Sequence, residues 1–500
     1  MQWTGFSTTR RLSKPIRFTL LAIAICLTVL IGTGRQPAMA NQALHYTELE
    51  FPPLPEITIP EYTRFELDNG LQVYLMEDHE LPLVSGTAYI YTGDRLEPAD
   101  QVGLASIVGE VMRSGGTPNY PADELNEFLE QRAASVETGI GTTAGSAGFS
   151  ALTEDLSDVF IRFADVLRDP AFPQDKIDLA IRQREGIIAR RNDSPEDILG
   201  REFAKLVYGE ASPYARTVEY RTLSNISRDD VVSFYEQYYA PNNMMLGIVG
   251  DFDPVEMRSL IEQAFDDWQP DPDLPRRESV GRVTQAHQGG VFMIDQPQLN
   301  QSYVQIGHLG GTLDSPDFAA LSVVNEVLNG LGGRLVNEVR SRQGLAYIVY
   351  AYWSPQFDYP GVFIAGGQTR SETTVPFIES TLAEVERVRT TPISPEELAQ
   401  AKESVLNSFV FNFQTPGQTL SRVMRYDLYD YPEDFIFQYR RQLEAVTVEQ
   451  VQQAAATYLK PEDIVMLVVG NQSAIQPPLE VLQPGTEVTQ LDITIPDLRG

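Results

Sequence analysis

Cysteine and histidine are almost absent from this 500-residue chain, and both shortages limit its chemistry. The single cysteine, Cys26, lies in an apolar run near the N-terminus. Without that run the chain has no thiol, which excludes disulfides and a cysteine nucleophile. The four histidines, His45, His79, His287 and His308, lie far apart in sequence. No two of them have the short spacing with which one helix holds a zinc ion between two histidines.

The first 40 residues have the three parts of a cleavable export signal. In order along the chain these parts are Arg10, Arg11, Lys14 and Arg17, the apolar run 18–31, and Ala38-Met39-Ala40. We predict cleavage after Ala40 and export to the periplasm or the extracellular space. An uncleaved membrane anchor is the alternative, although the apolar run is short for a span. Arg10-Arg11 also suggests a twin-arginine signal, but the residues that follow the pair fit general secretion better.

Basic residues are few, 38 against 69 acidic ones. Five basic residues and no acidic residue fall within the first 40, so the mature chain carries 33 − 69 = −36. Such a surface repels nucleic acid and anionic membrane faces. We interpret the acidic surface as a source of solubility, and attraction of basic peptides is the alternative interpretation. Hydrophobic residues make up 42% of the chain, which is enough for packed cores.

Two copies of one unit are predicted, over residues 61–270 and 286–480. Gly250 and Gly470 each end an apolar strand and lie 470 − 250 = 220 residues apart. Long helical stretches are predicted to end in Pro195 and Pro416, which lie 416 − 195 = 221 residues apart. Three further segments complete the predicted organisation after the signal, namely an extended arm at 41–60, a linker at 271–285 rich in Pro, Asp and Arg, and an extended tail at 481–500.

Within the first copy the local signals mix strands and helices. Asn69-Gly70 predicts a hairpin, because a tight turn needs the positive φ that this pair supplies. Residues 84–91 read as a further strand, and 102–113 and 174–191 as helices. We therefore expect an α+β fold with two homologous repeats, each a mostly antiparallel sheet packed with helices.

Five stretches, taken together and in order, resemble the pitrilysin/insulinase family of zinc metallopeptidases. The likeness is to its smaller two-domain members, which include the mitochondrial processing peptidase, and it covers about 62–475. The stretches are Leu67-Asp68-Asn69-Gly70-Leu71, Gly103-Leu104-Ala105, Asp193-Ser194-Pro195, the run 238–251, and 342–347.

This resemblance locates a metal motif that the chain has lost. The family carries H-x-x-E-H on the helix after Gly-Leu-Ala, where two histidines one turn apart bind zinc and the glutamate takes a proton from the metal-bound water. The matching positions here hold Ser106, Gly109 and Glu110. Serine is a poor zinc ligand, Gly109 has no side chain to act as a base, and Glu110 alone is insufficient.

The third ligand of the family is a glutamate on a later helix. The best match falls on Arg190 or Arg191, where a positive charge replaces the expected negative one, and Glu185 is out of register. Asp78-His79-Glu80 is interpreted as a solvated loop rather than a metal cluster. We therefore expect no metal in this chain.

The resemblance also implies a retained pair of donors. Active members use an arginine and a tyrosine seven residues apart to hold the substrate backbone and the developing oxyanion, and this chain has Arg340 and Tyr347. Guanidinium and phenol are both hydrogen-bond donors, as a tetrahedral intermediate requires. The alternative is a salt-bridged arginine and a core tyrosine. A glycine-rich stretch, 139–148, is interpreted as a strand edge that faces the substrate.

The leading hypothesis is division of labour between two subunits. This chain would be the non-catalytic, substrate-binding subunit of a heterodimeric exported peptidase, and a homologous partner with the zinc motif would supply zinc and the general base. Whether the chain alone is an enzyme stays open. One alternative is a non-enzymatic scaffold or assembly protein of the same fold. The other is an active peptidase with a non-standard site.

Overall fold

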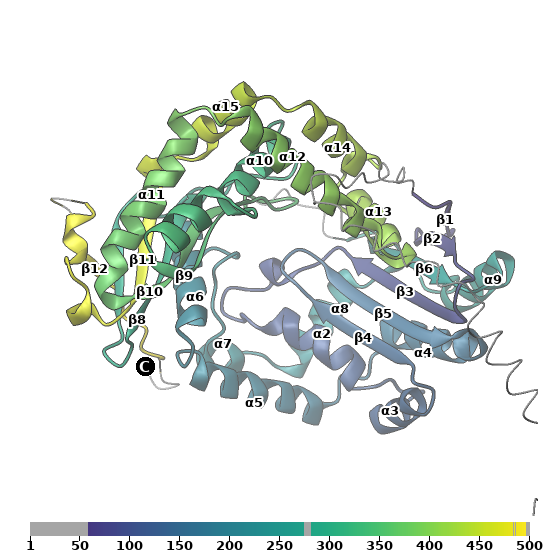
Figure 1. Cartoon of the computed structure of the whole chain (residues 1–500). Helices are drawn as coiled ribbons and strands as arrows, with labels where there is room; N and C mark the ends of the chain where they lie inside the picture. Colours follow the sequence, from purple (N-terminus) through teal and green to yellow (C-terminus); the bar gives the residue numbers. More distant parts are fainter. Residues whose placement is uncertain (1–58, 275–281, 484, 486, 497–500) are drawn as a thin grey trace, which may run out of the picture. The chain divides into compact units, whose positions relative to one another are not determined.

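The structure is a computed structural model that describes residues 59–274, 282–483, 485 and 487–496 (Figure 1). The predicted export signal and nearly all of the predicted arm, 41–60, lie outside the described residues. So does the middle of the predicted linker, 275–281. Among the described residues, no helix combines the length and the apolar character needed to cross a lipid bilayer.

Two six-stranded sheets form the framework of the described residues. The strands of the first sheet are β1 (Thr63–Glu66), β2 (Gln72–Glu77), β3 (Leu83–Ile90), β4 (Ser135–Ile140), β5 (Gly145–Leu152) and β6 (Met244–Gly250). The strands of the second sheet are β7 (Val291–Asp295), β8 (Gln301–Leu309), β9 (Ala346–Ser354), β10 (Val362–Arg370), β11 (Val465–Gly470) and β12 (Thr489–Gln490).

The strand orders confirm that the chain contains two homologous repeats. The first sheet runs β1-β2-β6-β3-β5-β4 and the second runs β12-β7-β11-β8-β10-β9. In each sheet the second and third strands of this order are parallel, and the three pairings that follow are antiparallel. Only the outermost strand differs, because β1 pairs antiparallel with β2 whereas β12 of the predicted tail pairs parallel with β7.

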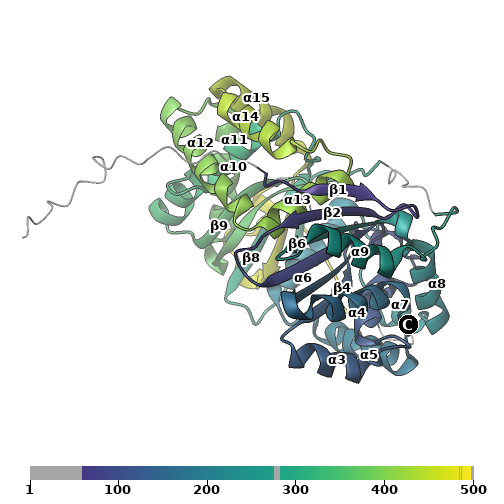
Figure 2. The same ribbon diagram turned by 90° about the vertical axis from the view of Figure 1, so that its right-hand side faces the viewer.

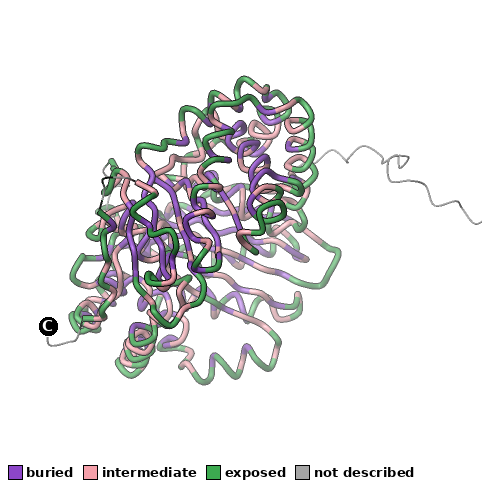
Figure 3. Tube along the Cα trace, turned by 60° about the vertical axis from the view of Figure 1, so that its left-hand side comes forward, coloured by how far each residue is buried: buried purple, intermediate pink, exposed green. Residues whose placement is uncertain are grey.

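Helices cover each sheet and enclose two main hydrophobic cores, whose buried runs are purple in Figure 3. The helices of the first repeat are α2 (Leu104–Ser114), α3 (Ala122–Gln131), α4 (Leu156–Arg168), α5 (Gln174–Arg190), α6 (Pro195–Tyr208), α7 (Tyr220–Ser224), α8 (Arg228–Tyr238) and α9 (Pro254–Phe265). The helices of the second repeat are α10 (Phe318–Asn329), α11 (Thr374–Thr390), α12 (Pro395–Phe409), α13 (Pro416–Leu428), α14 (Phe435–Ala445) and α15 (Val448–Tyr458).

One helix of each repeat packs on the sheet of the other repeat. Phe203 of α6 belongs to a buried cluster with Leu467 of β11, and Met424 of α13 belongs to one with Tyr74 of β2. Figure 2 shows α13 lying beside β2 and β6. The exchange explains why the central strands β6 and β11 are apolar on both faces, since each strand is covered by its own helices on one side and by the exchanged helix on the other.

Most local expectations are confirmed. Gly70 has φ 87° in the β1–β2 turn, and the strand predicted at 84–91 is β3. The helices predicted at 102–113 and 174–191 are α2 and α5. Arg340 lies in a π-helical turn, η5 (Val336–Arg342).

Candidate functional site

A buried carboxylate organises the start of helix α2. Gly103, with φ 108°, forms the N-cap. The two carboxylate oxygens of Glu97 accept hydrogen bonds from the backbone N–H groups of Gly103 and Ala105, each at 3.0 Å. These bonds satisfy donors that a helix N-terminus otherwise leaves unpaired. Burial of Glu97 raises its pKa to about 7, against the lowering effect of the two backbone donors.

A guanidinium lies between the two positions where the zinc-binding histidines were expected. Nε of Arg184 donates to Oγ of Ser106 at 3.0 Å, and Nη1 donates to Oε2 of Glu110 at 2.7 Å. Ser106 in turn donates to the Gly103 carbonyl at 2.9 Å. The side chain of Arg184 is only 14% exposed. A permanent positive charge therefore faces α2 from α5.

Gly109 allows strand β4 to lie directly against helix α2. A Cβ atom at position 109 would come within 2.6 Å of the Ile140 nitrogen and 2.8 Å of the Gly139 carbonyl carbon. The hydroxyl of Thr138 donates to the Gly109 carbonyl at 2.6 Å, so a hydrogen bond also links β4 to α2. The position where the general base was expected therefore has no space for a side chain unless β4 moves.

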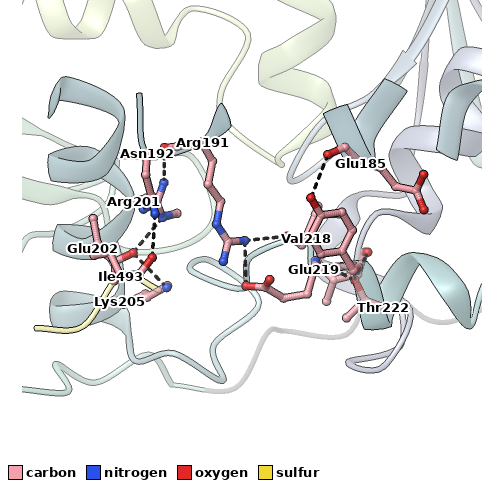
Figure 4. A network of polar contacts seen from close by, with 12 residues as sticks. Glu185, Arg191, Asn192, Arg201, Glu202, Lys205, Val218, Glu219, Thr222 and Ile493 are labelled. Atoms are coloured by element: carbon pink, nitrogen blue, oxygen red, sulfur yellow. Dashed lines mark hydrogen bonds and ion pairs between the residues drawn. The ribbon is translucent and has the colours of Figure 1, made fainter. Parts of the chain in front are cut away.

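The α5 residue that faces this motif is Arg184, and neither Arg190 nor Arg191 does so. Nε of Arg190 donates to the carbonyl of Gly186, one turn earlier on an exposed face of α5. Arg191 forms an ion pair with Glu219 at 2.9 Å, within the polar network that joins the end of α5 to α6 (Figure 4). Sequence reasoning missed Arg184, because the helical register alone does not show which face of α5 meets α2.

An open edge strand borders the motif. Strand β4 is the last strand of the first sheet and pairs only with β5. Between this edge and α2 lies a cleft of about 430 Å³ whose lining includes Ser106, Glu110, Glu137 and Gly139. The glycine-rich stretch 139–148 runs from β4 through the turn into β5. An unpaired strand edge can hydrogen-bond to an extended peptide.

Arg340 and Tyr347 lie side by side at the edge of the second sheet. The Arg340 guanidinium lies 5.1 Å from the centre of the Tyr347 ring. Tyr347 is 78% exposed and is therefore not a core residue. Among the described residues, Arg340 forms no salt bridge. Both halves of the structural alternative, a salt-bridged arginine and a core tyrosine, are therefore contradicted.

A β-bulge directs Tyr347 away from the sheet. Strand β9 pairs with β10 from Ser354 to Ile348, and the register then shifts so that Ala346 is the next paired residue. Tyr347 is left outside the ladder. Bulges commonly redirect a side chain at the edge of a sheet.

Two asparagines on α10 close part of the same edge. The side-chain amides of Asn325 and Asn329, one helical turn apart, each donate to and accept from the backbone of β9, at Trp353 and Ala351 respectively. The end of β9 next to Tyr347 lacks this cover. Sequence reasoning did not single out these asparagines, although polar side chains four residues apart on a buried helix were a visible signal.

Comparison with known proteins decides the family. Residues 72–210 match the insulinase family, peptidase family M16, and residues 225–405 match the M16 peptidase inactive domain. The chain belongs to the insulinase family. An uncharacterised zinc protease of Bacillus subtilis is 24% identical over 424 residues, which cover 81% of this chain and 97% of that protein. Another, from Mycobacterium leprae, is 28% identical over 404 residues and covers 78% and 87%.

Solved structures share the fold of this insulinase-family chain. The peptidase M16 inactive domain of Pseudomonas fluorescens superposes with a TM-score of 0.72 at 23% identity, covering 87% of this chain and all of that one. The periplasmic protease PqqL of Escherichia coli has a TM-score of 0.70 at 16% identity. That match covers 90% of this chain and 50% of PqqL.

The zinc ion that the insulinase family implies does not fit these residues. Of the three motif positions, only Glu110 has a side chain that commonly binds zinc, and its carboxylate already accepts from Arg184. A dication at this place would lie against a guanidinium that does not lose its proton. The described part of the chain contains no group of three His, Cys, Asp or Glu side chains placed to hold a metal. His79 instead pairs with Asp251 on the surface, Nδ1 to Oδ1 at 2.6 Å.

Proposed function

We propose that this chain is the substrate-binding, non-catalytic subunit of a heterodimeric zinc peptidase. The observation that carries the proposal is the contrast between the two repeats. In the first repeat the Arg184 guanidinium bonds to Ser106 and Glu110, where zinc ligands were expected. In the second repeat Arg340 and Tyr347 are exposed, and among the described residues no hydrogen bond or ion pair engages their donor groups. If the chain were an enzyme that had lost its function, we would not expect it to keep the Arg340–Tyr347 pair after losing the zinc motif.

Each subunit would have a defined task. A homologous partner that carries H-x-x-E-H would hold zinc and supply the general base. This chain would bind the extended peptide and direct the Arg340 guanidinium and the Tyr347 hydroxyl at the carbonyl oxygen that becomes negative. Donors held in place before the reaction stabilise that charge without reorganising. The exposed positions of both side chains support this role.

Export is part of the proposal. Its support is the signal-like sequence 1–40, the mature charge of −36 and the absence of cysteine after residue 40. The fold shared with a periplasmic protease is consistent with the same compartment.

The test is reconstitution with a zinc-motif homologue encoded next to this chain. We expect peptide cleavage by the pair and not by this chain alone. Arg340→Ala should lower kcat/KM by roughly 100-fold, the loss typical when one oxyanion donor is removed. Arg342→Ala is the matched control, because Arg342 lies on the same turn and its charge is paired with Glu338. Equal activity of Arg340→Ala and the unmodified pair would refute the assigned role.

Two further measurements separate the alternatives. A scaffold protein would form the complex, yet cleavage would be unchanged by either Arg340→Ala or Tyr347→Phe. An active peptidase with a non-standard site would retain stoichiometric zinc after purification of this chain alone. We expect less than one-tenth of a zinc ion per chain, measured by atomic emission.

A further inference from the structure

A second polar cleft is lined by neither Arg184 nor the Arg340–Tyr347 pair. It is formed between the turn η7 (Val410–Phe413), helix α13 and the loop that follows β9. Its volume is about 310 Å³, and its lining residues are Phe357, Phe411, Asn412, Gln418, Ser421, Arg422, Arg425 and Tyr426. Two of these residues are cationic and none is acidic, in a chain where acidic residues outnumber basic ones 69 to 38.

Both arginines of the cleft keep an uncompensated charge. Arg422 donates through Nη2 to Oδ1 of Asn412 at 2.7 Å, and its Nε is buried without a hydrogen-bond partner in the structure. Arg425 stacks its guanidinium over the Phe357 ring at 4.6 Å from the ring centre. Within the described part of the chain, neither arginine forms a salt bridge. Burying Nε of Arg422 without a partner is unfavourable. Arg425 lies one helical turn further along α13 and is exposed, so an anionic ligand could contact both guanidinium groups.

The acidic groups nearest in sequence are already engaged elsewhere. Asp427, on the same helix, accepts from Arg64 at 2.7 Å and from the Tyr74 hydroxyl. Asp358, next to Phe357 in the loop, pairs with Arg95 at 2.6 Å. These bonds hold both carboxylates toward the first repeat. The two arginines of the cleft are therefore left for a ligand from outside.

The remaining lining defines the ligand further. Phe411 is 63% exposed, and Phe357 and Tyr426 are the other aromatic residues of the lining. Asn412, Gln418 and Ser421 add neutral donors and acceptors. We propose that this cleft binds a carboxylate that adjoins an aromatic or large apolar group. Guanidinium groups match the planar carboxylate with paired hydrogen bonds, and the aromatic residues of the lining suit an apolar group beside it.

In a peptide, that carboxylate is either the C-terminus or an acidic side chain. The assignment to a peptide rests on the proposed function, whereas the carboxylate chemistry rests on the cleft alone. Such a site would hold one end of a substrate away from the reacting bond. It would favour peptides with an acidic or free C-terminal end that carries an aromatic residue.

The experiment measures peptide binding to the full chain without a partner subunit. Three heptapeptides that carry an uncharged fluorescent label at the N-terminus share a neutral sequence that ends in Phe. One has a free C-terminal carboxylate, one a C-terminal amide, and one the amide with Glu before the Phe. Fluorescence anisotropy should give at least roughly tenfold tighter binding for one of the two carboxylate peptides than for the neutral amide. The tighter of the two identifies the source of the carboxylate.

Variants connect the binding to the cleft. Arg425→Gln and Arg422→Gln should each remove the preference for the carboxylate peptide. Arg370→Gln is the control, because Arg370 is an exposed arginine of the same repeat that pairs with Glu372. Arg425 is itself exposed, so its variant tests the proposal even if Arg422→Gln unfolds.

Several results would overturn the proposal. They are equal affinity for all three peptides, no binding at millimolar concentration, an equal loss in Arg370→Gln, or displacement by inorganic phosphate at concentrations where acetate has no effect. None of these results depends on cleavage or on the zinc-bearing partner. Failure of this site is therefore distinguishable from failure of the role assigned to Arg340.

Discussion

Replacement of Gly109 by alanine tests whether strand β4 leaves space for a side chain at the position where the catalytic base was expected. In an open helix interior, Gly→Ala stabilises by roughly 0.5–1 kcal/mol, because alanine loses less backbone entropy on folding. At position 109 the new Cβ would instead lie 2.6–2.9 Å from three backbone atoms of Gly139 and Ile140. Backbone atoms in a paired strand do not yield easily, and overpacking of this kind costs roughly 1–3 kcal/mol. We therefore expect a net destabilisation of about 1–2 kcal/mol.

Gly186 supplies a matched control on the neighbouring helix. It lies in the interior of α5, and nothing stands within 4 Å of the Cβ that an alanine would add. Gly186→Ala should therefore stabilise the chain by about 0.5–1 kcal/mol. Urea unfolding, monitored by circular dichroism, measures the stability of each variant. A shift of the unfolding midpoint with an unchanged m-value reports a change in the free energy of unfolding. The two variants should shift the midpoint in opposite directions.

A stabilising effect of Gly109→Ala equal to that of Gly186→Ala would refute the reasoning. It would mean that β4 does not press on α2 and that a glutamate could return to position 109 without moving the strand. The expected result has a further consequence. Rebuilding the zinc motif by point substitution in this chain would require displacement of β4 as well as removal of Arg184.

Three other expectations follow from the same contacts. The folded-state pKa of Glu97, about 7, lies above its ordinary value of 4.5, so the folded chain binds the proton more tightly and loses up to about 3 kcal/mol of stability as pH rises from 4.5 to 7. The urea midpoints measured at pH 5 and pH 7.5 should therefore differ less in Glu97→Gln than in the unmodified chain. The same difference in both proteins would contradict this account. Arg184→Met and Glu110→Gln should show a coupling free energy of about 0.5–1 kcal/mol in a double-mutant cycle, since the ion pair is only partly buried; additive effects would mean that the pair contributes nothing. Phe203→Ala should cost roughly 3–5 kcal/mol by opening a cavity under α6, whereas the exposed Phe411→Ala should change thermal stability by less than about 0.5 kcal/mol; similar losses in both would show that α6 does not bury Phe203.

Expectations that rest on neighbouring residues are confirmed for the fold. Asn69-Gly70 predicted the β1–β2 turn because a tight hairpin needs positive φ, and the periodic apolar residues of 102–113 predicted α2. The duplication was also visible, since equivalent glycines and prolines recur at a nearly constant offset. The composition excluded thiol chemistry, and the residues at 106, 109 and 110 excluded the ordinary zinc motif.

Contacts between distant segments could not be predicted in this way. The sequence predicted a positive charge opposite the motif at Arg190 or Arg191, but the face with which α5 packs on α2 brings Arg184 there instead. The exchange of α6 and α13 between the repeats was equally hidden, because an amphipathic helix does not encode which sheet it covers. The sequence by itself determined that residues 106–110 do not form an H-x-x-E-H motif. Only the tertiary structure decided that a guanidinium and a backbone strand lie against these residues, because both come from segments far away in the chain.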